Sequence, residues 1–451
     1  MEDYEFTVNG VYEGLWEFPV NGEKQWGQLN INEGSVVLRI FGNGGVPRIN
    51  SGNISIIGKA YNNKKDEFHF QLMDLSISRV QCYGSDFFEL IFNIGQVLIS
   101  ENDSIDLCSI DCCIIRTELL DKWVWKYIKD GYSHNSTMLI NGSQILEYKQ
   151  KTTYKCYENR DYKTSLYFGT KTEHPSVNGF HMINRCFLNI HFTNKKNIVE
   201  VYDISNCIIC LLSLLLNVPV KPQYVKYRTS NNQFIFLQSR SNSSLKEDDT
   251  KLVFTNLTDF TNEEIVSIFD NWINLYKKYS DALVLFFYTK RNTDLSFDVR
   301  IKNYISVIDG ITECAVTDGS SNDTRKKQEL QSLLGRCNEL TPDEKNKIKM
   351  WVLREKGTEL RPRFRNLIFE VESLLPSEYI EKTYSVNSNE FVDKVLNTRN
   401  YLTHPKDSVE NEKIYLNEYY KYVFGLHKIL SVYLMNKIGV PEHLIKRISE
   451  F

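Results

Sequence analysis

The helical character of the C-terminal half is clearest in residues 391–405, which read FVDKVLNTRNYLTHP. Apolar side chains recur there every three or four residues, at Phe391, Val392, Val395, Leu396 and Leu402. That spacing is typical of one face of an α-helix. Pro405 pushes the residue before it out of the α region, so we expect His404 to leave the helix. It can then turn back toward Arg399, which lies five residues earlier near the helix end.

An arginine and a histidine that converge on one phosphate suit RNA cleavage without a metal. The 2'-hydroxyl can attack the neighbouring phosphorus if a group with a pKa of about 7 moves its proton, and histidine is such a group. Arg399 can offer two parallel donors to the phosphoryl oxygens, and Asn400 can orient the phosphate or the histidine. The spacing is also common by chance. The alternative is a structural arginine that caps a helix carbonyl, beside a histidine in a turn.

Helical spacing extends from Glu263 nearly to the end of the chain. Three further sets of apolar residues show it: Ile265, Ile268, Phe269 and Trp272; Ile301, Tyr304, Ile305 and Ile308; Tyr415, Tyr419, Tyr422 and Val423. This pattern predicts an all-α helical bundle.

The N-terminal half has a different pattern. From Tyr4 to about His191, short β-branched or aromatic runs alternate with Gly, Asn, Asp and Ser; one such run is residues 36–41. Period-two alternation between tight-turn candidates such as Asn141-Gly142 predicts an antiparallel sandwich or barrel. Ile204 to Leu216 can form a helix, and Phe234 to Leu237 a strand. The polar stretch from Ser239 to Thr250 is the expected linker. The predicted fold is therefore α+β, with a β-rich domain over residues 1–245 and a helical domain over 246–451.

Composition is that of an ordinary globular protein, with 42% hydrophobic and 25% charged residues. A net charge of -3 argues against bulk coating of nucleic acid but allows a local basic groove. The acidic N-terminus has no apolar signal core, and the most apolar segment, Cys207 to Val218, is too short to span a bilayer. We therefore expect a cytoplasmic protein without a membrane partner, whose ten cysteines are reduced.

Residues 398–405, Thr-Arg-Asn-Tyr-Leu-Thr-His-Pro, closely resemble the signature of HEPN ribonuclease domains. The Arg-Asn-x-x-Thr-His form, with Thr403 before the histidine, resembles the HEPN domain of ApeA-like antiphage proteins. Residues 300–310 resemble the first conserved helix of that domain, where Asp309 stands at the position of a common acidic residue. The runs 14–19, 27–29 and 36–42 resemble the opening of the ApeA N-terminal domain.

The resemblance implies a metal-independent endoribonuclease with no cofactor, in which Arg399, Asn400 and His404 are catalytic and Asp309 and Thr403 support them. Members of this kind are usually dimers whose two motifs build one cleft. They act in abortive infection, in which a phage-derived trigger activates cleavage of RNA, tRNA being one candidate. The β-rich domain would then be a sensor or regulator. A second interpretation is a non-catalytic HEPN module for dimerisation or nucleic-acid binding, joined to a ligand-recognising β domain.

Two other patterns have competing interpretations. Arg361, Arg363 and Arg365, which follow a lysine-rich run and flank Phe364, suit contacts to an RNA backbone. Interspersed glutamates favour instead a solvated helix face. Cys108, Cys112, Cys113 and the Cys207-x2-Cys210 pair could supply zinc ligands, but two of them are adjacent and two lie in an apolar helix, where cysteine commonly acts as a small hydrophobe. No metal site is expected.

Overall fold

The computed structural model describes residues 10–17, 23–32, 35–43, 55–83, 87–101, 107–130, 137–140, 143–146, 153–176, 179–229, 233–238, 254–292, 294–313, 332, 341, 360–376, 378–403 and 413–450. Its contacts form two compact units. The first contains residues 1–212 and 220–266, and the second contains residues 213–219 and 267–451. The described strands all belong to the first unit, and the second is helical. The predicted order, β-rich and then all-α, is confirmed. The expected linker, Ser239 to Thr250, lies outside the described residues.

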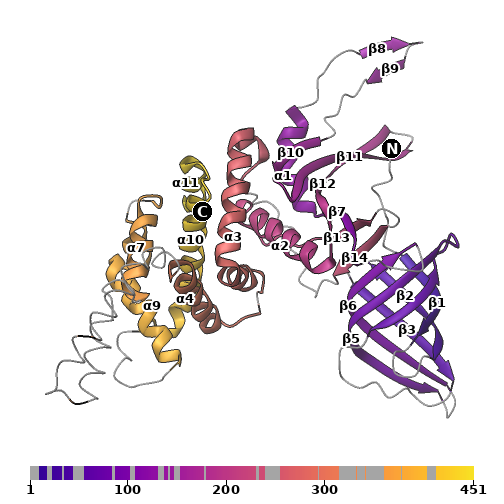
Figure 1. Ribbon diagram of the computed structural model, residues 1–451, viewed down its shortest axis with the longest axis horizontal. Coiled ribbons are helices and arrows are strands. Elements are labelled where there is room, and N and C mark those ends of the chain that lie inside the picture. Colours follow the sequence, from indigo (N-terminus) through magenta and orange to yellow (C-terminus); the bar gives the residue numbers. More distant parts are fainter. Residues whose placement is uncertain are drawn as a thin grey trace. The chain divides into compact units, whose positions relative to one another are not determined.

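The first six strands form a closed barrel (Figure 1). They are β1 (Gly10–Glu17), β2 (Lys24–Asn32), β3 (Ser35–Asn43), β4 (Ile56–Tyr61), β5 (Glu67–Tyr83) and β6 (Phe87–Ser100). Their order is β6-β3-β2-β1-β4-β5, every neighbouring pair is antiparallel, and β5 also pairs with β6. That last pairing leaves the barrel without an open edge.

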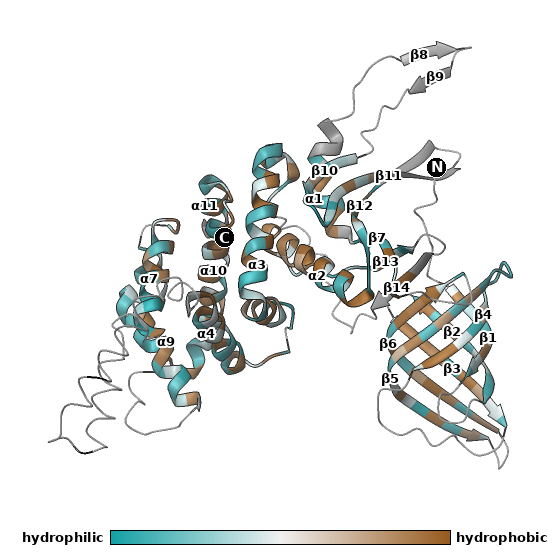
Figure 2. Cartoon of the chain, in the orientation of Figure 1, coloured by the Kyte–Doolittle hydropathy of each residue, from teal (hydrophilic) through white to brown (hydrophobic). Residues whose placement is uncertain are grey.

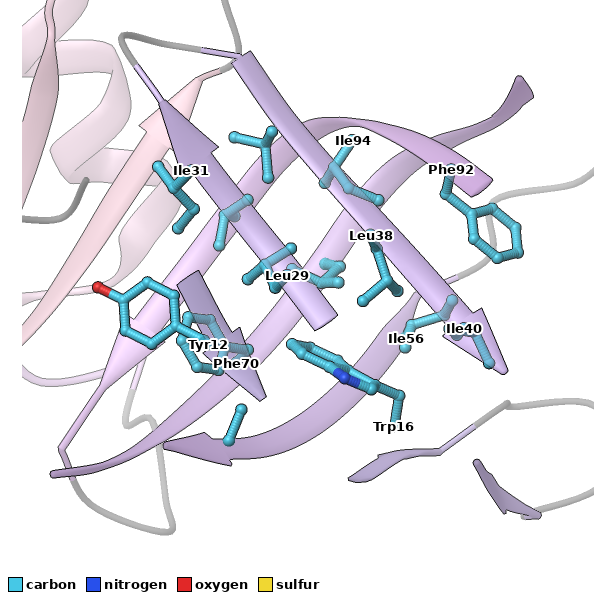
Figure 3. Packing of buried hydrophobic residues seen from close by; sticks show 14 of the residues in the cluster. Tyr12, Trp16, Leu29, Ile31, Leu38, Ile40, Ile56, Phe70, Phe92 and Ile94 are labelled. Atoms are coloured by element: carbon cyan, nitrogen blue, oxygen red, sulfur yellow. The ribbon is translucent and has the colours of Figure 1, made fainter. Parts of the chain in front are cut away.

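The barrel interior follows from the period-two pattern. Alternate residues are buried along most of these strands, except in the second half of β5, and their side chains meet in a single hydrophobic core, as the labelled residues of Figure 3 show. Trp16 is the largest of these side chains and is fully buried. A Cβ at Gly58, on the neighbouring strand β4, would collide with its indole ring. Gly58 therefore makes room for Trp16.

Six further strands of the first unit continue the same sheet. They are β7 (Ile110–Arg116), β10 (Thr153–Glu158), β11 (Tyr162–Ser176), β12 (Gly179–Lys196), β13 (Tyr224–Thr229) and β14 (Gln233–Gln238), in the order β10-β11-β12-β7-β13-β14, with β14 beside β6. The strand predicted at Phe234 is confirmed as β14. Two short strands, β8 (Thr137–Ile140) and β9 (Ser143–Leu146), pair antiparallel. The predicted tight turn Asn141-Gly142 lies between them, outside the described residues.

The helix α1 (Glu118–Asp130) corrects the expectation of strand-like structure up to His191. Its buried residues, Leu119, Leu120, Trp123 and Val124, have helical spacing and lie within one strand-dominated region of sequence. The helix packs against β12. Arg116 and Asp121 form two hydrogen bonds of 2.9 and 2.6 Å, and Asp121 also accepts from the backbone N–H of Cys186 on β12. Burial raises the pKa of the Asp121 carboxyl despite the nearby Arg116.

The helix α2 (Ile198–Leu215) begins six residues before the predicted start. Asn197 and Glu200 exchange hydrogen bonds between side chain and backbone, which is a capping box that starts the helix there. By length and composition α2 could cross a membrane, but 61% of it is buried inside the fold, as in the core helix of a soluble domain. Figure 2 shows its predominantly hydrophobic colouring.

The helical unit is built around α4. Its described helices are α3 (Asn262–Arg291, from Ser267 onward), α4 (Phe297–Glu313), α7 (Leu360–Glu372), α8 (Tyr379–Tyr384), α9 (Ser388–Thr403), α10 (Tyr419–Lys437) and α11 (Glu442–Glu450). α4 packs against α7, α9 and α10. The predicted helical periodicities are confirmed at α3, α4, α9 and α10, with one exception. Tyr415 precedes the short 3-10 helix Leu416–Glu418 and is 59% exposed.

Candidate active site

The helix α9 carries the Arg-Asn sequence at its C-terminal end. Its start is set by a second capping box: Glu390 donates its backbone N–H to Asn387, and the Glu390 carboxylate accepts from the Asn387 backbone. Its buried face consists of Phe391, Val392, Val395, Leu396 and Thr398. Because the apolar face is held by the bundle, the residues that follow it are presented at the helix end.

Arg399 lies in the last turn of α9 and is half-buried, whereas Asn400 is exposed. Among the residues that the structure describes, the Arg399 guanidinium makes no hydrogen bond and no ion pair. Thr403 donates its hydroxyl to the Arg399 carbonyl, at 2.8 Å, so this hydroxyl reinforces the helix end. The guanidinium therefore has its donors available for a ligand.

His404 lies outside the described residues, as does the chain up to residue 412. Where the description resumes, two contacts return to α9. The backbone N–H of Ile414 donates to the buried Thr398 hydroxyl at 2.8 Å, and the Lys413 ammonium lies 3.4 Å from the centre of the Tyr401 ring. Lys413 and Ile414 therefore lie against the last two turns of α9.

Two residues of α4 bear on this site. Lys302 contacts the end of α9, and Asp309 was predicted to support catalysis. Lys302 donates from its ammonium to the Leu402 carbonyl at 2.9 Å, a contact that the sequence pattern does not predict. Asp309 lies two turns further along α4, about 10 Å along the helix axis. Its carboxylate forms an ion pair of 2.6 Å with Arg363 of α7. Arg363 also donates to the Asp309 carbonyl. The structure thus shows a carboxylate that joins α4 to α7; its predicted role in catalysis stays a prediction.

Arg361 and Arg365 are also paired with acid. Both contact Asp393 of α9, with nitrogen–oxygen distances of 3.2 and 3.1 Å. These two arginines and Arg363 therefore connect α7 to its neighbours, and part of their charge is balanced by two carboxylates. Their predicted contact with RNA stays a prediction. The lysine-rich run before them lies outside the described residues.

The described part of the chain contains no group of three or more His, Cys, Asp or Glu side chains that could hold a metal ion. Cys112, Cys113, Cys207 and Cys210 are buried, and Cys108 is exposed. Burial raises the pKa of the Cys113 thiol well above its usual value, which disfavours the thiolate that a zinc ligand requires.

Comparison with known families identifies both halves of the chain. The family model described as ApeA N-terminal domain 1 matches residues 11–274, which is more than half of the chain. This protein belongs to the ApeA family. A second family model, Apea-like HEPN, matches residues 303–444, which extend from α4 to α11 and include the end of α9. The two matches follow each other in the order that the sequence resemblance predicted. No curated protein and no solved structure matches the chain.

Membership of the ApeA family makes this a nuclease-type antiphage defence protein by family. HEPN domains are generally ribonucleases, which supports a nuclease role for the helical unit. The HEPN match covers the end of α9 on which Arg399 lies. The guanidinium, unpaired among the described residues, therefore belongs to the part of the chain for which a nuclease role is supported.

Proposed function

We propose that this ApeA protein is a metal-independent endoribonuclease that acts in antiphage defence by abortive infection. The observation that carries the proposal is the HEPN match over residues 303–444 together with the unpaired Arg399 guanidinium, at the end of α9, among the described residues. A buried or half-buried arginine is costly to leave without a partner, which favours a role in binding an anion over a purely structural one.

In the proposed reaction a ribose 2'-hydroxyl attacks the adjacent phosphorus. His404 takes the hydroxyl proton, the bond from phosphorus to the 5'-oxygen breaks, and the imidazolium returns the proton to that oxygen as it leaves. The products are a 2',3'-cyclic phosphate and a 5'-hydroxyl end. Arg399 binds the non-bridging oxygens as negative charge builds on them, and Asn400 orients the phosphate or the imidazole. This chemistry needs only a general acid–base and a fixed donor pair.

The proposed substrate is RNA, with tRNA among the candidates, in the cytoplasm of the infected cell. Two copies of the chain would join their motifs in one cleft, and the N-terminal domain would respond to a phage-derived trigger. The exposed Asn400 at the end of α9 suits such a shared, open site.

The decisive experiment compares the wild type with His404→Ala on total tRNA and on a labelled single-stranded RNA, with excess EDTA. We expect the wild type to cut in EDTA and to leave 2',3'-cyclic phosphate ends, and the variant to lose cutting by at least about 100-fold, within the range for a general acid–base group. His443→Ala is the matched control, because His443 is an exposed histidine on α11 of the same unit. It should cut like the wild type.

Full activity of folded His404→Ala would contradict the proposed mechanism, and so would cutting that stops in EDTA. If the wild type binds RNA without cutting it, in the presence and absence of infected-cell extract, the non-catalytic HEPN module becomes the better interpretation.

A further inference from the structure

The ammonium group of Lys302 connects two helices that are far apart in sequence. It lies on α4, 100 residues before Leu402, and donates to the Leu402 carbonyl at 2.9 Å. Leu402 is the second-last residue of α9, so the contact is made at the extreme C-terminal end of that helix. α4 and α9 also pack against each other.

A lysine is well suited to this position. The last four carbonyl groups of a helix have no partner within it, and the C-terminal end carries a partial negative charge. The Lys302 ammonium meets both demands, because it donates a hydrogen bond to one of those carbonyls and brings a positive charge. Lys302 is itself half-buried, which limits competition from water for this bond.

An acidic residue lies one turn before Lys302 on α4. The Ser296 hydroxyl, its main hydrogen-bond donor, and the nearby Lys302 hold the pKa of the Asp298 carboxyl below its usual value. Asp298 is therefore ionised at neutral pH and adds a negative charge one turn from Lys302. Tyr419, the first residue of α10, interacts electrostatically with Asp298, Lys413 and Tyr401. The first turn of α4, the start of α10 and the end of α9 are therefore close to one another.

We infer that Lys302 is a positioning residue for the nuclease site. Leu402 lies three residues after Arg399, so both lie on one face of the last turn of α9. By holding the Leu402 carbonyl, Lys302 prevents this turn from fraying and keeps the Arg399 guanidinium in a fixed place relative to α4. Small displacements of a group that binds a reacting phosphate reduce the rate strongly. The role in cleavage rests on the proposed function; the anchoring of α9 does not.

The anchoring is tested by amide hydrogen exchange in the full chain. Lys302→Met removes the donor and keeps most of the side-chain volume, whereas Lys302→Arg retains a cationic donor. We expect exchange of the amides of residues 400–403 to become about fivefold faster in Lys302→Met, as a lost end contact predicts, and Lys302→Arg to restore most of the protection. Lys277→Met is the matched control: Lys277 is an exposed lysine of α3 with no contact among the described residues, and its loss should leave this exchange unchanged.

The role in cleavage is tested by the kinetics of the same variants. We expect kcat to fall by about tenfold in Lys302→Met, with KM for single-stranded RNA within about twofold, because alignment is lost while most of the binding surface remains. Lys302→Arg should recover most of kcat. Circular dichroism checks that each variant is folded, and Lys302→Gln, too short to reach the carbonyl, provides a second loss variant.

The exchange and the kinetic measurements test the anchoring and the positioning role separately. Unchanged exchange at residues 400–403 in both loss variants overturns the anchoring, whatever the enzyme does. Faster exchange with unchanged kcat overturns the role in positioning. Failure of the wild type to cut any RNA counts against the proposed nuclease, and the exchange experiment still decides whether Lys302 anchors α9.

Discussion

Four arginines of the helical unit differ in what their side chains contact. Arg361, Arg363 and Arg365 of α7 each contact a carboxylate of another helix. Arg399, by contrast, has no acidic partner in the described part of the chain. Ion-paired arginines hold helices together and offer less charge to a ligand, whereas an unpaired guanidinium retains its donors. At the scale of single residues, Arg399 is therefore the best candidate phosphate ligand.

This difference predicts the effect of conservative changes. Arg399→Lys should reduce RNA cleavage by about 100-fold, the cost of losing a donor to developing negative charge, because an ammonium cannot reproduce the planar donor pair. Arg361→Lys keeps the charge beside Asp393 at a position where the side chain is 45% exposed, and should cut within about twofold of the wild type. Initial rates on one labelled RNA measure both. Near-normal cleavage by Arg399→Lys would remove Arg399 from the phosphate.

Helices α8, α9 and α10 are joined by an aromatic cluster. The ring centres of Tyr384, Phe391 and Tyr422 lie 4.7 to 5.4 Å apart. The Tyr384 hydroxyl passes over Gly425 of α10 and donates to the Lys421 carbonyl at 3.3 Å. A Cβ at position 425 would collide with this hydroxyl. Because Phe391 belongs to α9, the packing that Gly425 permits also supports the helix that carries Arg399.

Gly425→Ala should consequently lower the free energy of unfolding by about 1 to 3 kcal/mol, the usual cost of overpacking a core, despite the better helix propensity of alanine. Urea unfolding followed by circular dichroism measures the change. The neighbouring Phe424 is 60% exposed, so Phe424→Ala should stay within about 0.5 kcal/mol of the wild type. Equal stability of Gly425→Ala and the wild type would mean that Tyr384 can move aside without cost.

At the scale of the whole molecule, the two compact units are not two uninterrupted stretches of sequence. Residues 213–219, which include the end of α2, group with the helical unit. Within this unit, Lys290 of α3 donates to the Ser213 carbonyl at 3.3 Å and to the Asn217 side chain at 3.2 Å. Lys290 thereby caps the C-terminal end of α2, whose last residues belong to the same unit.

Lys290 also makes stability depend on pH. Burial, together with the nearby Arg291, lowers the pKa of its ammonium from 10.5 to about 7. Between these two values the unfolded chain holds a proton that the folded protein lacks, so this group's contribution to stability rises as pH increases through that window. Buried cysteines and tyrosines make stability fall as pH rises above 9. Because the wild type and Lys290→Met share these residues, the difference between their stabilities isolates the contribution of Lys290.

We expect the stability of the wild type relative to Lys290→Met to increase by about 1 to 2 kcal/mol from pH 7 to pH 9, given ~1.4 kcal/mol per pH unit as the upper limit for one group. Urea midpoints at the two pH values measure it. Lys277→Met, which removes an exposed lysine, should show no such trend. A difference between wild type and Lys290→Met that is independent of pH would place the folded-state pKa of Lys290 outside this window.

Local patterns in the sequence determined much of this protein. Period-two alternation predicted the strands of the first domain, helical spacing predicted α3, α4, α9 and α10, and the run from Arg399 to His404 predicted the HEPN domain that the family comparison supports. These features are legible because burial of one face repeats over a few residues, at a period set by backbone geometry. The helix α1 had the same kind of signal at Leu119 and Trp123, but the strands around it favoured the wrong interpretation.

Tertiary structure alone decided the features that depend on distant residues. The β5–β6 pairing turns a sheet into a closed barrel. The pairing of Asp309 with Arg363, over 54 residues, and of Lys302 with Leu402, over 100, assigns some charged side chains to structure and leaves Arg399 free among the described residues. Each depends on which elements become neighbours, and that follows from packing the whole core, not from any short stretch of sequence.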